Sequence, residues 1–159
     1  LIRILVGDFL CYIIELILFF VKNTRISDCN FKTLQNFSDF KGNLNVIEGI
    51  KGITNEILQF NRAYILRDFK DQIRGVHAHK NLYQLFLTLN GEFTLKIYDG
   101  YESKEIRLED GSAFLVVPGI WRELNDFSNK PIIVVMASEL YDPNDYIHLL
   151  EEFKSYKNN

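Results

Sequence analysis

Two histidines separated by one residue are the part of this sequence best suited to chemistry. They are His77 and His79, in the run RGVHAHK over residues 74–80. In an extended strand, side chains two residues apart point to the same face. Both imidazoles would then face one space, and histidine is the side chain that titrates nearest neutral pH. The spacing is therefore suited to proton transfer or to metal ligation.

The residues that follow the pair resemble a cupin, a small β-barrel, with altered metal ligands. A metal-binding cupin usually has a glutamate soon after its H-x-H motif and a third histidine after a later Pro-Gly turn. Here Gln84 stands in place of the glutamate, and Arg122, after Pro118-Gly119, stands in place of the third histidine. An amide is a weak ligand for a divalent ion and a guanidinium is a cation. Proton transfer is therefore favoured over metal binding, and a third reading, two histidines merely packed inside a barrel, stays open.

Composition limits the class of protein. The 159 residues are 47% hydrophobic and 14% aromatic, which is enough for one domain with a buried core. A net charge of -3 and a pI near 5.6 argue against nucleic-acid binding, which needs clustered lysine and arginine. A local cationic pocket for a small anionic ligand stays open, because several basic residues lie near the predicted strands: Lys41, Arg62, Arg74, Lys80 and Arg122.

The two cysteines bear on the cellular compartment. Cys11 and Cys29 show no metal-ligand spacing and lie outside the histidine segment. They are typical of free thiols in a reducing compartment, so we expect a cytoplasmic protein.

The first 30 residues differ from the rest. Most of them are apolar, and the apolar run is long enough to cross a bilayer. Asp8, Glu15 and Lys22 recur every seven residues, so on a helix they form one narrow polar stripe. Such a helix also fits a membrane surface or an interface within an oligomer. We interpret residues 1–30 as an apolar helical extension, with no secretory signal, and we do not expect residues 1–22 to contact a membrane.

Residues 31–159 read as one all-β domain that ends in a helix. Turn signals such as Asn90-Gly91 and Asp99-Gly100 separate short β-rich segments, and many short strands at this spacing indicate a sandwich or barrel. The predicted fold is a cupin-type jelly-roll β-barrel with a C-terminal helix. The predicted strands are Phe31–Asn36, Leu44–Glu48, Arg62–Asp68, Val76–Lys80, Tyr83–Asn90, Glu92–Tyr98, Glu105–Leu108, Ala113–Val117 and Ile132–Ser138.

The C-terminal helix is predicted from a cap and an apolar face. Asp142 is a candidate N-cap followed by a proline in the first turn. The apolar face consists of Tyr146, Leu149, Leu150 and Phe153. His148 falls on this predicted helix, where we expect a surface or packing role.

Separate motifs along the chain resemble the WxcM-like cupins that act as dTDP-4-oxo-6-deoxyglucose 3,4-ketoisomerases in deoxysugar biosynthesis. The similarity runs from about residue 31 to about residue 156. Several motifs in the correct order are more specific than one H-x-H pair. Besides the histidine run and Gln84, they are FSD (37–39), GNL (42–44), VIE (46–48), RAY (62–64), DG (99–100), PGIWRE (118–123), DFS (126–128), AS (137–138), YD (141–142) and DYI (145–147).

The resemblance implies a metal-independent isomerase without a cofactor. It would interconvert the 4-oxo and 3-oxo forms of a dTDP-6-deoxyhexose in deoxysugar or surface polysaccharide biosynthesis, including lipopolysaccharide. It also implies a homodimer that exchanges N-terminal strands. Two alternatives are kept: a non-catalytic cupin that binds a nucleotide sugar, and a metal-dependent cupin enzyme.

Three residues are predicted to be catalytic. A base must remove the hydrogen on sugar carbon 3, and a proton must return to carbon 4 while the two oxygens exchange theirs. We assign His77 and His79 to these transfers, one as the carbon base and the other as the shuttle between the oxygens, with the order left open. Tyr64 is predicted to donate a hydrogen bond to the developing oxyanion. The family often has two adjacent tyrosines here, but this chain has Tyr64-Ile65, so Tyr64 alone can carry that role.

Seven residues are predicted to bind the substrate. Arg74 is the first candidate for the diphosphate, because a guanidinium holds phosphate oxygens through two parallel hydrogen bonds. Glu123 could orient an imidazole or pair with a cation, and Gln84 could orient a histidine or a sugar hydroxyl. Trp121 either stacks on a ring or lies in the core. The remaining candidates are Lys41, Lys80 and Arg122, and no metal site is predicted.

Overall fold

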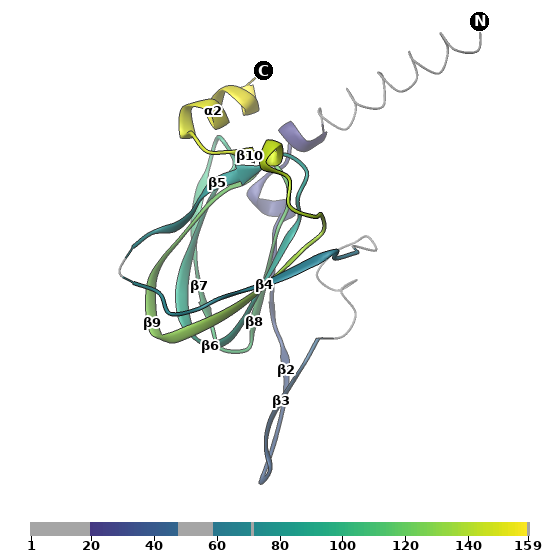
Figure 1. The fold of residues 1–159 in the computed structure, drawn as a ribbon, viewed down its shortest axis with the longest axis vertical. Helices are drawn as coiled ribbons and strands as arrows, with labels where there is room; N and C mark the ends of the chain where they lie inside the picture. The colour runs from purple at the N-terminus through teal and green to yellow at the C-terminus, as the bar shows by residue number, and fades with distance from the viewer. Residues whose placement is uncertain (1–19, 48–58, 71, 159) are drawn as a thin grey trace, which may run out of the picture.

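The computed structural model of the chain describes residues 20–47, 59–70 and 72–158. Within them, an eight-stranded antiparallel sheet makes up the body of the molecule, and a separate two-stranded sheet projects from it (Figure 1). The elements are η1 (Ile26–Asp28), β1 (Asn30–Thr33), β2 (Gln35–Asp39), β3 (Gly42–Val46), β4 (Arg62–Leu66), β5 (Arg74–His79), β6 (Gln84–Tyr98), β7 (Ser103–Glu109), β8 (Ser112–Val116), β9 (Trp121–Ala137), η3 (Pro143–Asp145), β10 (Tyr146–Ile147) and α2 (Leu150–Asn158).

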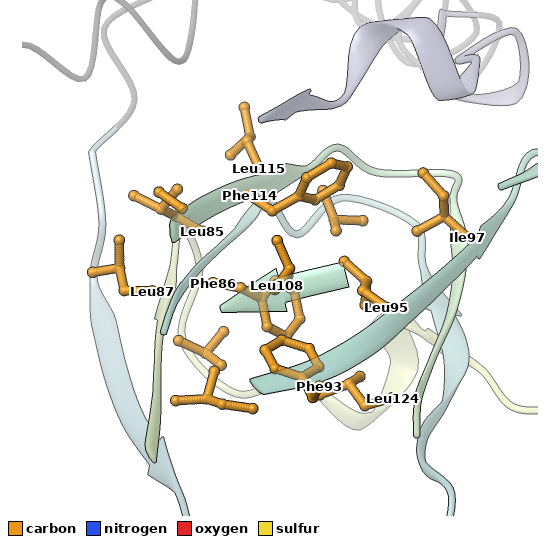
Figure 2. Close-up of a cluster of buried hydrophobic side chains, with 14 of the residues drawn as sticks. Leu85, Phe86, Leu87, Phe93, Leu95, Ile97, Leu108, Phe114, Leu115 and Leu124 are labelled. Atoms are coloured by element: carbon orange, nitrogen blue, oxygen red, sulfur yellow. The ribbon is translucent and has the colours of Figure 1, made fainter. Parts of the chain in front are cut away.

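Two long strands form the centre of the sheet. β6 and β9 pair antiparallel from Gln84 opposite Ala137 to Tyr98 opposite Trp121. In the second half of β6 the buried side chains alternate with partly exposed ones, as the period of two in a strand requires. The core gathers large apolar side chains from β6 to β9, including Phe93, Leu95, Ile97, Leu108 and Leu124 (Figure 2). Each such side chain contributes about 1.5–3 kcal/mol when it is fully buried.

Some predicted strand boundaries were wrong. Asn90-Gly91 does not end a strand, because β6 continues through it and the pairing with β9 shifts register at this point. β9 begins at Trp121 and not at Ile132. Its first half is rich in polar residues and so lacks a strand pattern, yet it pairs with both β6 and β5. The boundaries of β6 and β9 are therefore set by pairing with neighbouring strands and not by the local sequence pattern.

The mostly antiparallel β-structure is confirmed, but the predicted closed barrel is not. The order β1-β8-β6-β9-β5-β10, with β4 on β9 and β7 on β6, leaves the sheet open in the described residues. Two features account for this. β10 has only two residues, and β2 and β3 pair with each other and leave the body of the molecule instead of extending the sheet.

The predicted C-terminal helix is present, but it begins later than expected. Asp142 does cap a helical turn, since its side chain accepts from the backbone of Asn144 at 2.9 Å, but that turn is the short η3. Tyr146 then lies in β10 and not on a helix, because β10 pairs with β5. α2 follows from Leu150, and its Phe153 is fully buried in a second apolar cluster that includes Trp121.

The predicted N-terminal extension lies mostly outside the described residues. Residues 20–22 are helical, but nothing is described for residues 1–19, which include Cys11. The second cysteine, Cys29, is a free thiol whose pKa is raised by burial to about 12. None of the helices in the described segments has the length and apolar character needed to span a bilayer. The division of the chain at residue 30 stays a prediction.

Gly91→Ala tests the bend in β6. Gly91 has φ +68, and an added Cβ would lie 2.7 Å from the carbonyl oxygens of Ser128 and Asn129. We expect the free energy of unfolding to fall by about 2–4 kcal/mol, from the left-handed backbone and the clash together. Urea denaturation measures this. Gly42→Ala is the control, because its φ is also positive but no atom lies within 4 Å, so a similar loss in both variants would contradict the steric argument.

Candidate active site

Three adjacent strands bring the two histidines together. β5 lies between β9 and β10, with His77 opposite Arg122 and His79 opposite Tyr146. Because residues two apart share a face of a strand, both imidazoles point to the same side of β5. Their ring centroids are 4.9 Å apart and the rings meet edge to face. The imidazoles therefore form one cluster.

Arg122 fixes the ring of His77. Its Nη1 donates to the backbone carbonyl of His77 at 2.8 Å, and its Nη2 donates to the ring nitrogen Nε2. A guanidinium has only donors, so Nε2 must be the accepting nitrogen and the hydrogen of the neutral ring lies on Nδ1. Burial lowers the pKa of Arg122 to about 10, which still leaves it charged at neutral pH. The lone pair of His77 is therefore already engaged.

A carboxylate fixes His79. Its Nδ1 donates to Oδ2 of Asp145 at 2.7 Å, while Oδ1 accepts from the backbone and side-chain amides of Asn81 at 2.7 and 3.1 Å. Burial acts to raise the pKa of Asp145, but the hydrogen bonds from His79 and Asn81 outweigh it and hold the pKa below its usual value. Nε2 of His79 is buried without a hydrogen-bond partner. That nitrogen carries a free lone pair and is a base.

Burial keeps both imidazoles neutral. It lowers the pKa of His77 to about 2, with a further contribution from the positive charge of Arg122. It lowers the pKa of His79 to about 4, although the hydrogen bond to Asp145 acts in the opposite direction. Near neutral pH both rings are therefore unprotonated, as a proton acceptor must be.

A cavity of about 340 Å³ opens beside this cluster. That volume lies at the lower end of the range of about 300–1,000 Å³ for small-molecule sites. Three arginines and no carboxylate are among the described residues that line it, so the cavity favours an anionic ligand. The lining consists of Arg62, Tyr64, Leu66, Arg74, Gly75, His77, Gln84, Phe86, Arg122, Leu124 and Tyr146.

Tyr64 presents a hydroxyl to the same cavity. Its oxygen accepts from the side-chain amide of Gln84 at 2.7 Å, so its hydrogen is free to donate to a ligand. Burial raises the pKa of Tyr64, and the phenol therefore keeps its proton. The guanidinium of Arg62 lies 5.4 Å from the centre of the Tyr64 ring and 5.7 Å from that of Tyr141. Aromatic rings thus hold this cation at the cavity.

Comparison with known proteins agrees with this geometry. Residues 27–158 match the sequence model of the family described as WxcM-like, C-terminal (FdtA). The chain belongs to the WxcM-like family. Over 129 residues it is 39% identical to the TDP-4-oxo-6-deoxy-alpha-D-glucose-3,4-oxoisomerase of Aneurinibacillus thermoaerophilus, covering 80% of this chain and 88% of that protein.

Solved structures of 3,4-ketoisomerases have the same fold. A 3,4-ketoisomerase from Helicobacter canadensis is 30% identical with a TM-score of 0.75, over 83% of this chain and 98% of that one. A histidine-to-asparagine mutant of the 3,4-ketoisomerase QdtA from Thermoanaerobacterium thermosaccharolyticum, in complex with TDP-4-keto-6-deoxyglucose, is 28% identical with a TM-score of 0.75. It matches over 84% of this chain and 96% of that one.

The structure of this WxcM-like protein brings together some of the predicted site residues. His77, Tyr64, Arg74, Gln84 and Arg122 line the cavity, and His79 lies directly behind them. They lie in one region because β4, β5 and β6 each pair with β9 in the sheet.

Four other predicted residues lie away from the cavity. Along β9, Trp121 and Glu123 face the side opposite to Arg122, and the Trp121 Nε1 donates to Glu123 at 3.0 Å. Lys80 donates to the backbone carbonyl of Asn144 at 2.9 Å. Lys41 lies in the turn of the β2–β3 hairpin. Within a single chain, none of the four reaches a ligand in the cavity.

Sequence reasoning assigned no catalytic or binding role to three residues at this site. Asp145 contacts His79 in the way proposed for Glu123, Tyr146 lines the cavity, and His148 lies beside Tyr146. The segment DYI at 145–147 was part of the family resemblance, and this was the only signal. The motif did not reveal that these residues lie beside the histidines, because the pairing of β10 with β5 is a tertiary contact.

The described residues contain no group of three or more His, Cys, Asp or Glu side chains that could hold a metal ion. The chemistry of the cluster also opposes a metal, because the nitrogen of His77 that could ligate it accepts from a guanidinium.

Lowering the pH should destabilise the fold through the buried histidines. An unfolded histidine has a pKa near 6.5, whereas the folded values are about 2 and about 4. A depressed folded pKa gives stability that is present above pH 6.5 and is lost as the pH falls toward the folded value. Urea unfolding between pH 7 and pH 5 should show a loss of up to about 1.4 kcal/mol per pH unit for each histidine. His79→Asn should reduce the slope, and an unchanged slope would contradict the burial argument.

Proposed function

We propose that this protein is a TDP-sugar 3,4-ketoisomerase that works without a metal ion. The observation that carries the proposal is the pair of neutral imidazoles beside an arginine-lined cavity, fixed on opposite sides by Arg122 and Asp145. The named relatives include a TDP-sugar 3,4-oxoisomerase and a 3,4-ketoisomerase solved in complex with TDP-4-keto-6-deoxyglucose, which supports the same reaction here.

His79 is the carbon base in this proposal. Its Nε2 is free, and the carboxylate of Asp145 would stabilise the imidazolium that forms when this nitrogen removes the hydrogen from carbon 3. His77 is the weaker base, since its Nε2 already accepts from Arg122. The choice between the two histidines therefore follows from their different hydrogen-bond partners.

The negative charge that develops on the carbonyl oxygen needs donors. Arg122 supplies a positive charge, neutral His77 carries a hydrogen on Nδ1, and Tyr64 has a hydroxyl hydrogen to donate. Donors held in place in a buried site stabilise such a charge without having to reorganise. Together, these three side chains would stabilise the enediolate, the intermediate common to the 4-oxo and 3-oxo sugars.

Two arginines suit the diphosphate of the substrate. Arg74, predicted from sequence, lies exposed at the cavity, and Arg62 lies half-buried between two tyrosine rings. Guanidinium groups bind phosphate oxygens through paired hydrogen bonds. We assign the diphosphate to these two residues. The family resemblance further supports a role in deoxysugar or surface polysaccharide biosynthesis in the cytoplasm.

We also propose a homodimer built through the β2–β3 hairpin. The hairpin projects from the sheet (Figure 1), and large apolar side chains on it face solvent: Phe37, Phe40 and Leu44 are 52%, 93% and 61% exposed. A clustered apolar surface of this kind marks an interaction site. A second copy of the chain, as the family resemblance implies, would cover it.

Turnover of TDP-4-keto-6-deoxyglucose tests the reaction and the base. After chelator treatment, proton NMR should show conversion to the 3-keto sugar, with kcat lowered at least about a hundredfold in His79→Asn and less in His77→Asn. Asp145→Asn should lower kcat by about tenfold or more, while the remote exposed Glu105→Gln should not change it. Activity that returns only with added metal would refute the metal-free reaction, and full activity of His79→Asn would refute the base.

Phe40→Asp tests the dimer. The wild-type chain should have twice the 18.7 kDa mass of one chain in light scattering, and the variant should shift toward the monomer because a charge cannot be buried in an apolar interface without a partner. Tyr101→Ser, which alters an exposed aromatic residue outside the hairpin, should stay dimeric. A monomeric wild-type protein would exclude the dimer.

A further inference from the structure

Tyr146 in β10 and His148 directly after it place two more side chains on the face that carries the histidine pair. Tyr146 pairs with His79 and Ile147 with Ala78, so one further step of this antiparallel register brings His148 level with His77. By the period of two, Tyr146 and His148 share a face, and it is the face of the two imidazoles. All three histidines of the chain therefore meet at this site. His148 is exposed and packs on Tyr146, in keeping with the predicted surface or packing role, but it precedes α2 instead of lying on the helix.

Tyr146 contacts both histidine rings and also lines the cavity. Its ring centroid is 4.4 Å from that of His79 and 4.8 Å from that of His77. Tyr146 and His77 are among the residues that line the cavity, whereas His79 is 3% exposed and is not. A ligand in the cavity thus meets the Tyr146 ring beside the base.

The proposed isomerisation requires a second proton transfer besides the one at carbon. One proton leaves carbon 3 and returns to carbon 4, while another leaves the oxygen on carbon 3 and reaches the oxygen on carbon 4. The group that serves the oxygens must give up a proton and take one back. Neutral His77 is unsuited to this, because Arg122 engages its lone pair and loss of the Nδ1 hydrogen would leave an imidazolate. A phenol gives up its proton far more readily.

We propose that Tyr146 is a further catalytic residue, the phenol that carries the proton between the two substrate oxygens. This assignment rests on the proposed isomerase function. As His79 removes the hydrogen from carbon 3, the electron pair of that bond forms the carbon–carbon double bond and the carbonyl oxygen takes the proton of Tyr146. The phenolate then removes the proton from the other hydroxyl, and the imidazolium of His79 protonates carbon 4. Both side chains return to their starting forms.

The surrounding charges suit a short-lived phenolate. When Tyr146 has lost its proton, His79 has just gained one, and the two rings are in edge-to-face contact. The guanidinium of Arg122 also interacts electrostatically with Tyr146. An anion formed beside two cations in a buried site is strongly stabilised. Tyr64 also interacts electrostatically with Arg122, so what distinguishes Tyr146 is the contact of its ring with that of His79.

His148 is a positioning residue in this assignment. Its ring stacks on Tyr146 with a centroid distance of 5.3 Å and an interplanar angle of 13°. Tyr141 contacts Tyr146 as well, at 5.9 Å. β10 is only two residues long, so its backbone pairing gives Tyr146 little support. Stacking on His148 fixes the phenol against the imidazoles.

Tyr146→Phe tests the phenol, because the ring remains and only the hydroxyl is lost. With TDP-4-keto-6-deoxyglucose we expect kcat to fall at least about a hundredfold with little change in KM. The oxygen transfer should become the slow step. The kinetic effect of deuterium at carbon 3 should then shrink relative to wild type, and the effect of D₂O should grow. Tyr101→Phe, an exposed tyrosine remote from the site, is the matched control and should behave as wild type.

The same measurements separate the possible failures. Wild-type kcat in Tyr146→Phe would overturn the assignment, and so would a low kcat with an unchanged or larger carbon-3 isotope effect, which would place Tyr146 in the carbon step or in the fold. If the wild-type protein does not turn over the substrate, the proposed function fails and this assignment fails with it.

His148 is tested by removing its ring and restoring a flat one. His148→Ala should lower kcat by about tenfold at unchanged KM, with the same shift in isotope effects as Tyr146→Phe. His148→Phe keeps the stacking surface and should restore most of the rate. If His148→Phe is as slow as His148→Ala, the imidazole does more than position Tyr146, and the stacking role is wrong.

Discussion

The site depends on two hydrogen bonds of opposite character, one to each buried imidazole. Arg122 can only donate, so it occupies the lone pair of His77, while ionised Asp145 can only accept, so it draws the hydrogen of His79 and leaves a lone pair on the other nitrogen. Two identical side chains thereby become chemically different. Burial lowers the pKa of both imidazoles and keeps them neutral, so His79 has a free lone pair while that of His77 is occupied.

The rest of the fold holds these two partners in place. Arg122 is fixed because β9 is a long central strand, paired with β6 along almost its whole length around the apolar core. Asp145 is held less extensively, at the end of η3, by its bonds to His79 and Asn81 and by its backbone carbonyl, which accepts from Lys80 at 2.9 Å. The histidine pair therefore lies between β9, which is extensively paired, and the segment around β10, which is paired over only two residues. The stacked rings of Tyr146 and His148 add packing on the weaker side.

Several residues show where local sequence was informative and where it was not. The period of two in a strand placed His77 and His79 on one face, and the altered ligand pattern at Gln84 and Arg122 pointed away from a metal. Glu123 was predicted to orient an imidazole or to pair with a cation, but its side chain faces the other side of β9 from Arg122 and accepts from Trp121. Asp145, more than sixty residues from His79 along the chain, orients that imidazole instead.

The sequence by itself determined the mostly β-architecture, the helix at the C-terminus, the family and the histidine pair, because strand periodicity and contiguous motifs are local properties of a chain. The tertiary structure alone decided that the sheet stays open, that β9 extends back to Trp121, and that Asp145, Tyr146 and His148 belong to the site. Pairing between β5 and β10 joins distant segments, and the register of such a pair depends on the packing of the whole sheet and not on the residues within either strand.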